Sequence, residues 1–380
     1  MSDMNPSHSV QTSTPEQPLD LFLAGSLFFD VIFTGLTSRM APGTEVMADG
    51  MGSVPGGIAN LAVAASRLGL NTGLSTGFGD DAYGRWSWSL LSKQEHIDLS
   101  RSRMFEHWHS AVTVSIATDG DRSMITHGHD MPESFATMIG NPPSASACII
   151  DLHTSHDEEP WWNSVDTAAT KIFADSGWDP TEKWDVATLA PLDRCHAFLP
   201  NHVEAMKYTR TETPEQALTK LADRVPLAVV TRGADGAIAV DSETGERASA
   251  PGLPVRAFDA TGAGDVFAAG IVLGTLEGWP LEQRLRFAIL CSGLAVENFG
   301  GSLASPGWGD IADWWAMLRS RSDAYSRELS REYGFLDDAI PRHATRSVRR
   351  AEATFGLLDE AEHHAHGTFS PPQTPTHKDT

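Results

Sequence analysis

The residues best suited to chemistry form the segment Asp-Ala-Thr-Gly-Ala-Gly-Asp at 259–265, which leads into an apolar helical pattern. Gly262, Ala263 and Gly264 have little or no side chain, so an anionic oxygen can approach the backbone N–H groups of such a turn closely. Asp265 beside them can accept a proton from an alcohol while the amides stabilise charge on a transferring phosphoryl group. The segment therefore predicts a phosphotransfer site. A tight turn with an aspartate at a helix start is the alternative interpretation.

A second glycine-rich segment, Gly-Phe-Gly-Asp-Asp-Ala at 77–82, matches the short G-x-G-x-x-A fingerprint of dinucleotide-binding proteins. It raises the alternative of an NAD-dependent oxidoreductase. A bound pyrophosphate would lie at the start of the following helix, where Asp80 and Asp81 would neutralise the helix dipole and repel the ligand. The sequence contains no G-x-x-x-x-G-K-[ST] segment, which argues against a P-loop enzyme. The dinucleotide interpretation is therefore the weaker one.

The elements that must position these residues follow an alternating pattern of apolar runs and helical stretches from Leu21 onward. This alternation predicts an α/β fold with a parallel sheet covered by helices on both faces. Two stretches of alternating polarity, at about 32–54 and 107–127, predict strands of a small sheet that forms a lid. The predicted organisation is a disordered N-terminal arm at 1–18, a main domain at 19–310, and a charged helical extension at 311–380 that ends in a disordered tail.

The chain has 380 residues with 28 Lys and Arg against 50 Asp and Glu, giving a net charge of −22. Such a charge repels nucleic-acid backbones, and no basic patch stands out, so no nucleic-acid partner is expected. The apolar stretch Leu21 to Leu36 is too short to span a bilayer comfortably and contains Asp30, so no membrane association is expected. Cys148, Cys195 and Cys291 are odd in number and widely spaced, which predicts buried thiols in a cytoplasmic protein.

Further motifs occur in a characteristic order along the chain. They are GSLFFD at 25–30, GGIAN at 56–60, GDDAYG at 79–84, NHVE at 201–204, VVTRGADGAI at 229–238 and DATGAGD at 259–265. The ordered set, from about Leu21 to Asp310, resembles the ribokinase-like carbohydrate kinases, also called the PfkB family. The resemblance implies a three-layer α/β/α sandwich with a mostly parallel central sheet and a small β-sheet lid. It also implies ATP-dependent phosphorylation of a hydroxyl group on a small sugar or sugar-like substrate.

The resemblance assigns a role to each matching residue. Asp265 would be the general base, and the backbone of 262–265 would form the anion hole. Asn201 and Glu204 would hold Mg²⁺, through water, beside the ATP phosphates, because this hard cation prefers oxygen ligands and retains waters. The remaining implied assignments are Thr231, Arg232 and Gly233 for the nucleotide, Asp30, Gly56, Gly57 and Asn60 for the sugar, and Asp259 and Thr261 for a monovalent cation such as K⁺.

Each assignment has a structural alternative. Asp30 could cap a turn, Asn201 and Glu204 could be ordinary helix-start residues, and Arg232 could belong to a surface ion pair. The family usually has three residues between the paired glycines and the asparagine, whereas only Ile58 and Ala59 intervene here. The sugar contacts are therefore left open.

Two alternative functions share the expected fold. One is a nucleoside kinase, which would have the same phosphate-side residues and a different sugar-side pocket. The other is a nucleotide- or sugar-binding regulatory protein without activity, against which the intact Asp265 segment argues. The family pattern also allows a homodimer formed through the lid.

Three other features have weaker functional interpretations. Asp175 lies where the family often ends a central strand in Asp, and could assist magnesium. Tryptophans in the 153–190 connection, at positions 161, 162, 178 and 184, are expected to pack on the domain surface. Histidine pairs at 107 and 109 and at 127 and 129 could each place two rings on one face of a lid strand, as in a zinc site. A polar lid face explains the histidines better.

Overall fold

The computed structural model describes residues 18–118, 121–153, 160–177, 179, 181–298 and 300–344. Residues 1–17 of the predicted arm, residues 345–380 of the predicted extension, and Trp178 lie outside the described residues. Within the described part of the chain, no helix is both long enough and apolar enough to cross a membrane.

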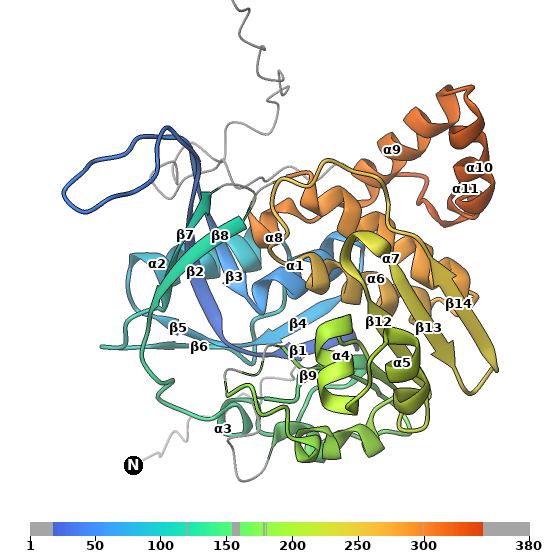
Figure 1. Ribbon diagram of the computed structural model, residues 1–380. Helices are drawn as coiled ribbons and strands as arrows, with labels where there is room; N and C mark the ends of the chain where they lie inside the picture. Colours follow the sequence, from blue (N-terminus) through green and yellow to red (C-terminus); the bar gives the residue numbers. More distant parts are fainter. Residues whose placement is uncertain are drawn as a thin grey trace, which may run out of the picture.

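An eight-stranded sheet forms the centre of the molecule (Figure 1). The strands from β12 to β4 run parallel, and β13 and β14 continue the sheet antiparallel at one edge. In sheet order they are β14 (Glu246–Ala250), β13 (Ala237–Asp241), β12 (Leu227–Thr231), β11 (Ala197–Phe198), β10 (Lys171–Asp175), β9 (Ala145–Asp151), β1 (Leu19–Ala24) and β4 (Thr72–Ser75).

Helices cover both faces of this sheet, and successive strand residues alternate between two cores. In β9, Ala147 and Ile149 belong to one core, and Cys148 and Ile150 belong to the other. This apolar run on both faces is typical of a strand in a buried parallel sheet. One face carries α1 (Ala59–Arg67), α6 (Ala263–Leu276) and α7 (Leu281–Val296), and the other carries α4 (His202–Thr209) and α5 (Pro214–Ala222). The predicted three-layer α/β/α sandwich is confirmed.

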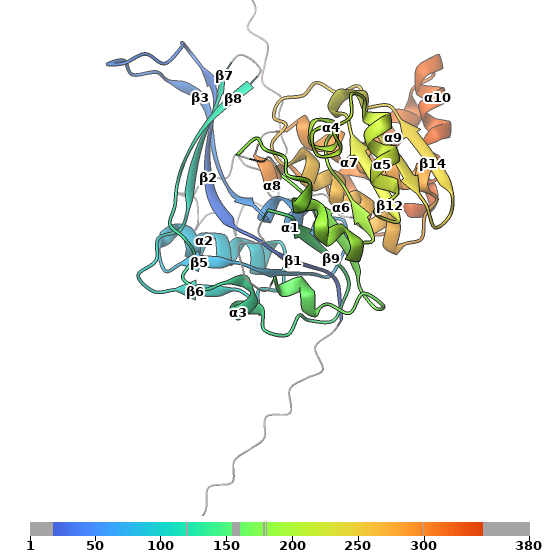
Figure 2. The same cartoon turned by 60° about the horizontal axis from the view of Figure 1, so that its bottom comes forward.

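A second sheet of four strands stands beside the sandwich (Figure 2). Its order is β3-β2-β7-β8, with β2 parallel to β7 and the other neighbours antiparallel. The strands are β2 (Leu27–Leu36), β3 (Ala48–Gly57), β7 (Val112–Thr118) and β8 (Asp121–His127). This sheet is the predicted lid, and with it the ribokinase-like fold class is confirmed.

The connection between the two sheets includes a short strand pair, β5 (Gly77–Gly79) and β6 (Arg103–Phe105), and the helix α2 (Ala82–Ser89). Tyr83 and Trp86 of α2 pack against Phe29 of the lid, with ring centroids 4.7 and 5.3 Å apart. These contacts anchor the base of the lid to the main domain. A five-residue π-helical segment, η1 (Leu90–Gln94), follows α2 directly.

The histidine pairs are not arranged on lid strands as predicted. His107 and His109 precede β7, and His107 has a positive φ of 58°; His129 follows the last residue of β8. Only His127 lies within a strand, so the expectation of two rings on one strand face is wrong. The chain turns at His107 and has no regular secondary structure at His109 and His129, so the alternation of polarity there does not reflect strand periodicity.

The tryptophan-rich connection packs on the sandwich. Trp161 and Trp162 of η2 (Trp161–Ser164) and Trp184 are all buried in the second core, which confirms the packing interpretation for these three. The three cysteines are also buried and free, as predicted. Two further short helices are α3 (Phe135–Ile139), which precedes β9, and η3 (Val186–Arg194).

The C-terminal helices are α8 (Gly301–Ala304), α9 (Trp308–Ser320), α10 (Ala324–Glu332) and α11 (Leu336–Ala339). The boundary predicted at residue 310 falls inside α9. Ile311 and Trp315 of that helix are buried in the same core as α1, α6 and α7, and the indole N–H of Trp308 donates to the Leu68 carbonyl at 2.7 Å. The described part of the predicted extension is thus integrated into the main core.

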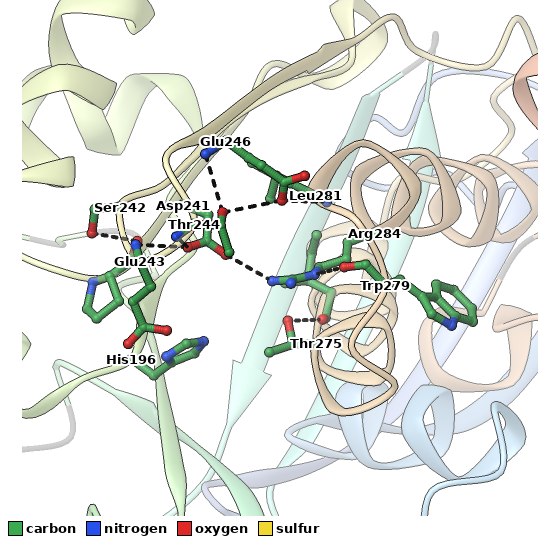
Figure 3. A network of polar contacts seen from close by, with 12 residues as sticks. His196, Asp241, Ser242, Glu243, Thr244, Glu246, Thr275, Trp279, Leu281 and Arg284 are labelled. Atoms are coloured by element: carbon green, nitrogen blue, oxygen red, sulfur yellow. Dashed lines mark hydrogen bonds and ion pairs between the residues drawn. The ribbon is translucent and has the colours of Figure 1, made fainter.

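A buried ion pair fastens the antiparallel edge of the sheet to α7 (Figure 3). Arg284 Nη1 lies 3.3 Å from Asp241 Oδ2, and Arg284 Nε donates to the Trp279 carbonyl. The other oxygen of Asp241 accepts two backbone N–H bonds, and Glu246 accepts the backbone N–H of Leu281. Asp241 pairs with Leu227, the first residue of β12, so the network lies at the amino end of the parallel strands.

Candidate active site

Polar residues gather at the opposite edge of the sheet, where the parallel strands end. Asp151 and Asp175 are the last residues of β9 and β10 and lie side by side in register. Thr231 ends β12, and Asn201, which follows β11, is bridged to it. In open α/β sheets, ligands bind outside the carboxyl ends of the strands. The sheet therefore brings residues from four segments to the edge where a substrate would bind.

The turn before α6 leaves several backbone amides unused. Gly262 adopts a left-handed conformation (φ +74°) and no side chain caps the helix. The N–H of Ala263, one of the predicted anion-hole groups, donates to the Ala260 carbonyl at 3.2 Å. Among the described residues, the N–H groups of Gly262, Gly264 and Asp265 have no hydrogen-bond acceptor. Free amides at a helix N-terminus form an anion-binding concavity.

Asp265 lies in the first turn of α6, directly beside these amides. Its Oδ2 accepts a hydrogen bond from Asn60 Nδ2 at 3.2 Å. Burial, and secondarily the negative charge of Asp175, raise the pKa of Asp265 to about 7, although the Asn60 bond acts in the opposite direction. A carboxyl group that titrates near neutrality can both accept and release a proton at physiological pH.

The residues predicted to bind sugar lie together at the base of the lid. A Cβ atom on Gly56 would be 2.0 Å from Asp30 Oδ2, so only glycine leaves room for that carboxylate. Gly57 has a φ of +62°, and a Cβ there would lie 2.4 Å from the Ser26 carbonyl oxygen. The segment then enters α1, where Asn60 reaches Asp265. The structure therefore links the Asp30 and Gly56 region to the Asp265 turn.

Asn201 and Glu204, the predicted magnesium residues, form a reciprocal capping box at the start of α4. Asn201 Oδ1 accepts the N–H groups of Val203 and Glu204, and Glu204 Oε2 accepts the Asn201 N–H at 2.9 Å. Asn201 and Glu204 are therefore helix-start residues, as the structural alternative predicted. Glu204 is nevertheless buried, and burial together with the nearby Asp175 raises its pKa to about 7. Its Oε1 accepts no hydrogen bond among the described residues.

Arg232 and Gly233, two of the predicted nucleotide residues, follow β12 at the same edge. The Arg232 guanidinium lies 3.6 Å from Glu215 and donates to the Asp235 carbonyl at 3.2 Å, which is the ion-pair alternative. Gly233 has a φ of +57°, and nothing lies within 4 Å of the position that a Cβ would take. Thr231 is held by its N–H bond to the Pro200 carbonyl. Their role toward a nucleotide remains a prediction.

Asp259 and Thr261, the predicted cation ligands, brace the loop before α6. Asp259 Oδ1 accepts both the N–H and the hydroxyl of Thr261, and Oδ2 accepts the N–H of Gly300 at 3.2 Å. Both carboxylate oxygens are therefore bonded to the protein itself. This bracing joins the turn at 262 to the glycine pair at 300–301.

Sequence reasoning missed the contribution of the segment 300–302. Ser302 is fully buried, and its hydroxyl donates to the Pro55 carbonyl at the end of β3. Gly301 (φ +46°) lies against the Asn60 side chain. The adjacent glycines at 300 and 301 were the only signal in the sequence, and they precede no motif that would have marked them. Asp151 was missed as well, although it ends a strand in the same way as Asp175.

The alternative sites found in the sequence show no comparable geometry. Asp81 caps α2 by accepting the Gly84 N–H at 2.8 Å, so the N-terminus expected to bind a dinucleotide is already occupied by a carboxylate. The rings of His109 and His129 each lie within 6 Å of the His127 ring, centroid to centroid. Among the described residues, no group of three or more His, Cys, Asp or Glu side chains could hold a metal ion.

Comparisons with known proteins agree with this architecture. The model of the pfkB family of carbohydrate kinases matches residues 20–307. The chain is 25% identical to a ribokinase of Lactococcus lactis over 291 residues, covering 74% of this chain and 92% of the relative. It is 26% identical to a nucleoside kinase of Methanothermobacter thermautotrophicus over 297 residues, covering 77% and 94%. Its fold resembles a putative ribokinase II from E. coli in complex with ATP and Mg²⁺, with a TM-score of 0.65, 17% identity, and coverage of 79% and 99%.

Proposed function

The chain belongs to the PfkB family of carbohydrate kinases, and on that premise we propose that it phosphorylates a hydroxyl group of a small sugar or sugar-like substrate with ATP, using Asp265 as the general base. As a kinase of this family it is a phosphotransferase with an alcohol acceptor. The observation that carries the proposal is the placement of the Asp265 carboxyl group beside free amides at the start of α6.

The proposed reaction uses both features of this turn. Asp265 takes the proton of the substrate hydroxyl while the hydroxyl oxygen forms a bond to the γ-phosphorus of ATP. The bond between that phosphorus and the oxygen that links it to the β-phosphate breaks, and ADP is released. The N–H groups of Gly262, Gly264 and Asp265 hold the negative charge of the phosphoryl oxygens during the transfer. Asp30, Gly56 and Gly57 would hold the sugar at the base of the lid, and the lid would exclude water.

Asn201 and Glu204 fit a magnesium ion that accompanies ATP. Among the residues that the structure describes, none donates a hydrogen bond to Oε1 of Glu204. The Glu204 side chain is buried, and Asp175 adds negative charge beside it. Because Asn201 Oδ1 already accepts two backbone N–H groups, the carboxylate oxygen of Glu204 and retained waters would be the ligands of this hard cation here. When bound, the ion would neutralise charge on the ATP phosphates. Thr231, Arg232 and Gly233 would lie along the nucleotide, where Arg232 could exchange Glu215 for a phosphate.

Two further assignments are proposed on the same basis. Asp259 and Thr261 stand where the family resemblance puts a monovalent cation such as K⁺, which would bind through the backbone of this loop. A homodimer would form through the lid sheet.

A nucleoside kinase is the second candidate, and the similarity to the archaeal nucleoside kinase favours keeping it. Both candidates use the same phosphate-side residues, so the test must vary the acceptor. A panel of sugars and nucleosides in a coupled ADP-release assay separates them. Turnover with sugars alone supports the proposal, and turnover confined to nucleosides replaces it.

The variant Asp265→Asn tests the assigned base. Asparagine keeps the size of the side chain and removes its ability to accept the hydroxyl proton, so kcat should fall by roughly 10²- to 10⁴-fold. The affinity for ATP, measured by calorimetry, should stay within about threefold because the amides of the turn are unchanged. An unchanged kcat would remove Asp265 from the mechanism.

A further inference from the structure

A cavity of about 950 Å³ lies between the main domain and the C-terminal helices. The main domain contributes Leu68 at the end of α1, Leu276 at the end of α6, and Trp279. The other wall comes from Trp308 of α9 and from residues within 334–341, around α11. These residues follow the segment that the family model matches. A cavity of this size can hold a small molecule, and the C-terminal extension helps to build it.

This cavity lies at the end of the sandwich opposite to the Asp265 turn. Asp20 and Ser146, the second residues of β1 and β9, line it, so it is at the amino end of the parallel strands. Asp265 is in the first turn of α6 and Leu276 is its last residue, and a helix of 14 residues spans about 20 Å. The cavity is therefore separate from the site proposed for phosphotransfer.

Aromatic rings form part of the cavity wall. Trp279, Trp308 and Phe335 line it, and each of the three is only half-buried. The ring centroids of Trp279 and Phe335 are 5.8 Å apart, and Phe287 packs behind them, 5.1 Å from Trp279 and 5.3 Å from Trp308. Aromatic rings bind apolar groups through contact area and attract cations to their faces. Such a wall suits a ligand with an apolar body, a positive charge, or both.

Three acidic residues line the same cavity. They are Asp20, Glu277 and Asp338, and the lining contains no Lys, Arg or His. Within the described part of the chain, none of the three forms an ion pair. Arg284, which donates to the Trp279 carbonyl, is committed to its buried ion pair at the edge of the sheet. The cavity therefore carries negative charge that no neighbouring side chain neutralises.

Two helix ends add to this negative potential. Glu277 is the C-cap of α6, whose last turn contains no basic residue. Leu68 is the C-cap of α1, and Arg67 in the last turn of that helix is bound to the carboxylate of Glu95. The C-terminal end of a helix carries partial negative charge, so a carboxylate is unfavourable there and a cation is favourable. Helix ends and acidic side chains thus select the same kind of ligand.

We propose that this cavity is a binding site for a small organic cation, with an ammonium group carried on an aromatic or other apolar body. The ammonium group would lie beside Glu277 and Asp338, and the apolar body would lie against Trp279 and Phe335. The same charges repel ATP and sugar phosphates. The ligand class is therefore different from the substrates of the proposed reaction, and the site does not depend on that reaction.

Calorimetry on the full chain tests the ligand class with two probes of nearly the same shape. Tryptamine carries an ammonium group at neutral pH, and tryptophol has an uncharged hydroxyl group in its place. We expect tryptamine to bind at least about tenfold more tightly than tryptophol, and added salt to weaken tryptamine binding. Equal affinity for the two probes, or no binding of tryptamine, would overturn the proposal.

A double variant, Glu277→Gln with Asp338→Asn, tests the location. Both side chains are exposed, so the fold should be kept, and the affinity for tryptamine should fall roughly threefold to tenfold. The matched control is Glu212→Gln with Asp223→Asn, which removes the same two charges at exposed positions flanking α5, on the other face of the sheet. The control should bind tryptamine as the wild type does. Unchanged affinity in the first double variant would overturn the location.

NMR provides a direct readout at the aromatic wall. Tryptamine should shift the indole N–H resonance of Trp279, which is assigned through its loss in Trp279→Phe. ATP with magnesium should not displace the amine, because the two sites lie at opposite ends of α6. A Trp279 resonance that stays unmoved at saturation would place the amine elsewhere. These measurements are independent of turnover, so they can succeed even where the panel of sugars and nucleosides gives no activity.

Discussion

At the level of single residues, the site brings together buried carboxyl groups whose pKa is raised first by burial and then by the negative charge of a neighbouring acid. Asp175 acts on both Asp265 and Glu204, and Asp151 acts on Asp175, whose own pKa burial raises to about 6. Like charges held close together disfavour ionisation. Such a group of acids includes one carboxyl group, that of Asp265, that titrates near neutral pH.

The pH dependence of the reaction follows from Asp265. A general base must be ionised, so kcat should fall about tenfold per unit as the pH drops below about 7. In Asp175→Asn the opposing charge is lost, and the acid limb should move to lower pH by about one unit because the ionised form of Asp265 is then favoured. Steady-state rates from pH 5 to 9 provide the measurement. A limb that moves upward in this variant would contradict the coupling.

At the level of elements, two helices bring the site together. α1 and α6 pack against each other, and their first turns carry Asn60 and Asp265 respectively. The turn before α6 depends on Gly262, which must be left-handed and must leave space for Asn60. A third helix, α8, also contributes, because the hydroxyl of its residue Ser302 donates a hydrogen bond to the Pro55 carbonyl of β3. The position of the Asp265 carboxylate therefore depends on residues that need not touch any substrate.

The variant Gly262→Ala tests this dependence. A left-handed alanine costs about 1–2 kcal/mol of folding free energy, and its Cβ would also press on Asn60. We expect kcat to fall about tenfold or more because the carboxylate and the amides are displaced. The control is Gly278→Ala at the other end of α6, where φ is +67° and no atom lies within 4 Å of the added Cβ. It should lose similar stability in urea and keep its kcat. An equal loss of activity in both variants would contradict the dependence of the Asp265 turn on Gly262.

At the level of the whole molecule, the two ends of the parallel strands in the main sheet carry different groups of polar residues. The carboxyl edge of the parallel strands carries the acidic site, and the amino edge carries the Arg284 and Asp241 network (Figure 3). Both side chains of this pair are nearly inaccessible to solvent. Removing one partner of such a pair leaves a buried charge, which is costly, whereas exposed pairs contribute little. Stability at this edge should therefore be separable from activity.

Arg284→Met should lower the free energy of unfolding by about 3 kcal/mol, because Asp241 then lacks its cation. The double variant Arg284→Met with Asp241→Asn should recover part of that loss. Arg319→Met, which breaks an exposed pair with Asp337, should cost less than about 1 kcal/mol. Urea denaturation measures all three. Equal losses for the buried and exposed pairs would contradict this account, and KM values of the folded variants should match the wild type.

Much of the fold was predictable because its signals are local. The alternation of short apolar runs with helical patterns predicted the sandwich, and the polarity of the stretches near 32–54 and 107–127 predicted a second sheet. The turn at 262–265 was predictable for the same reason, since glycine and aspartate affect the backbone conformation within a few residues. The positions of His107 and His109 were predicted wrongly because alternating polarity also occurs in a turn.

The chain by itself determined the sandwich, the order of its motifs and the residue types at the start of α6. Tertiary packing alone decided that Asn60 meets Asp265, that Asp175 lies close enough to raise its pKa, and that the residues after Gly300 enclose the same side chain. The physical reason is the distance along the chain over which each kind of interaction acts. Periodicity and turn chemistry act between neighbours along the chain, whereas contacts between residues 205 positions apart depend on how α1 and α6 pack on the sheet.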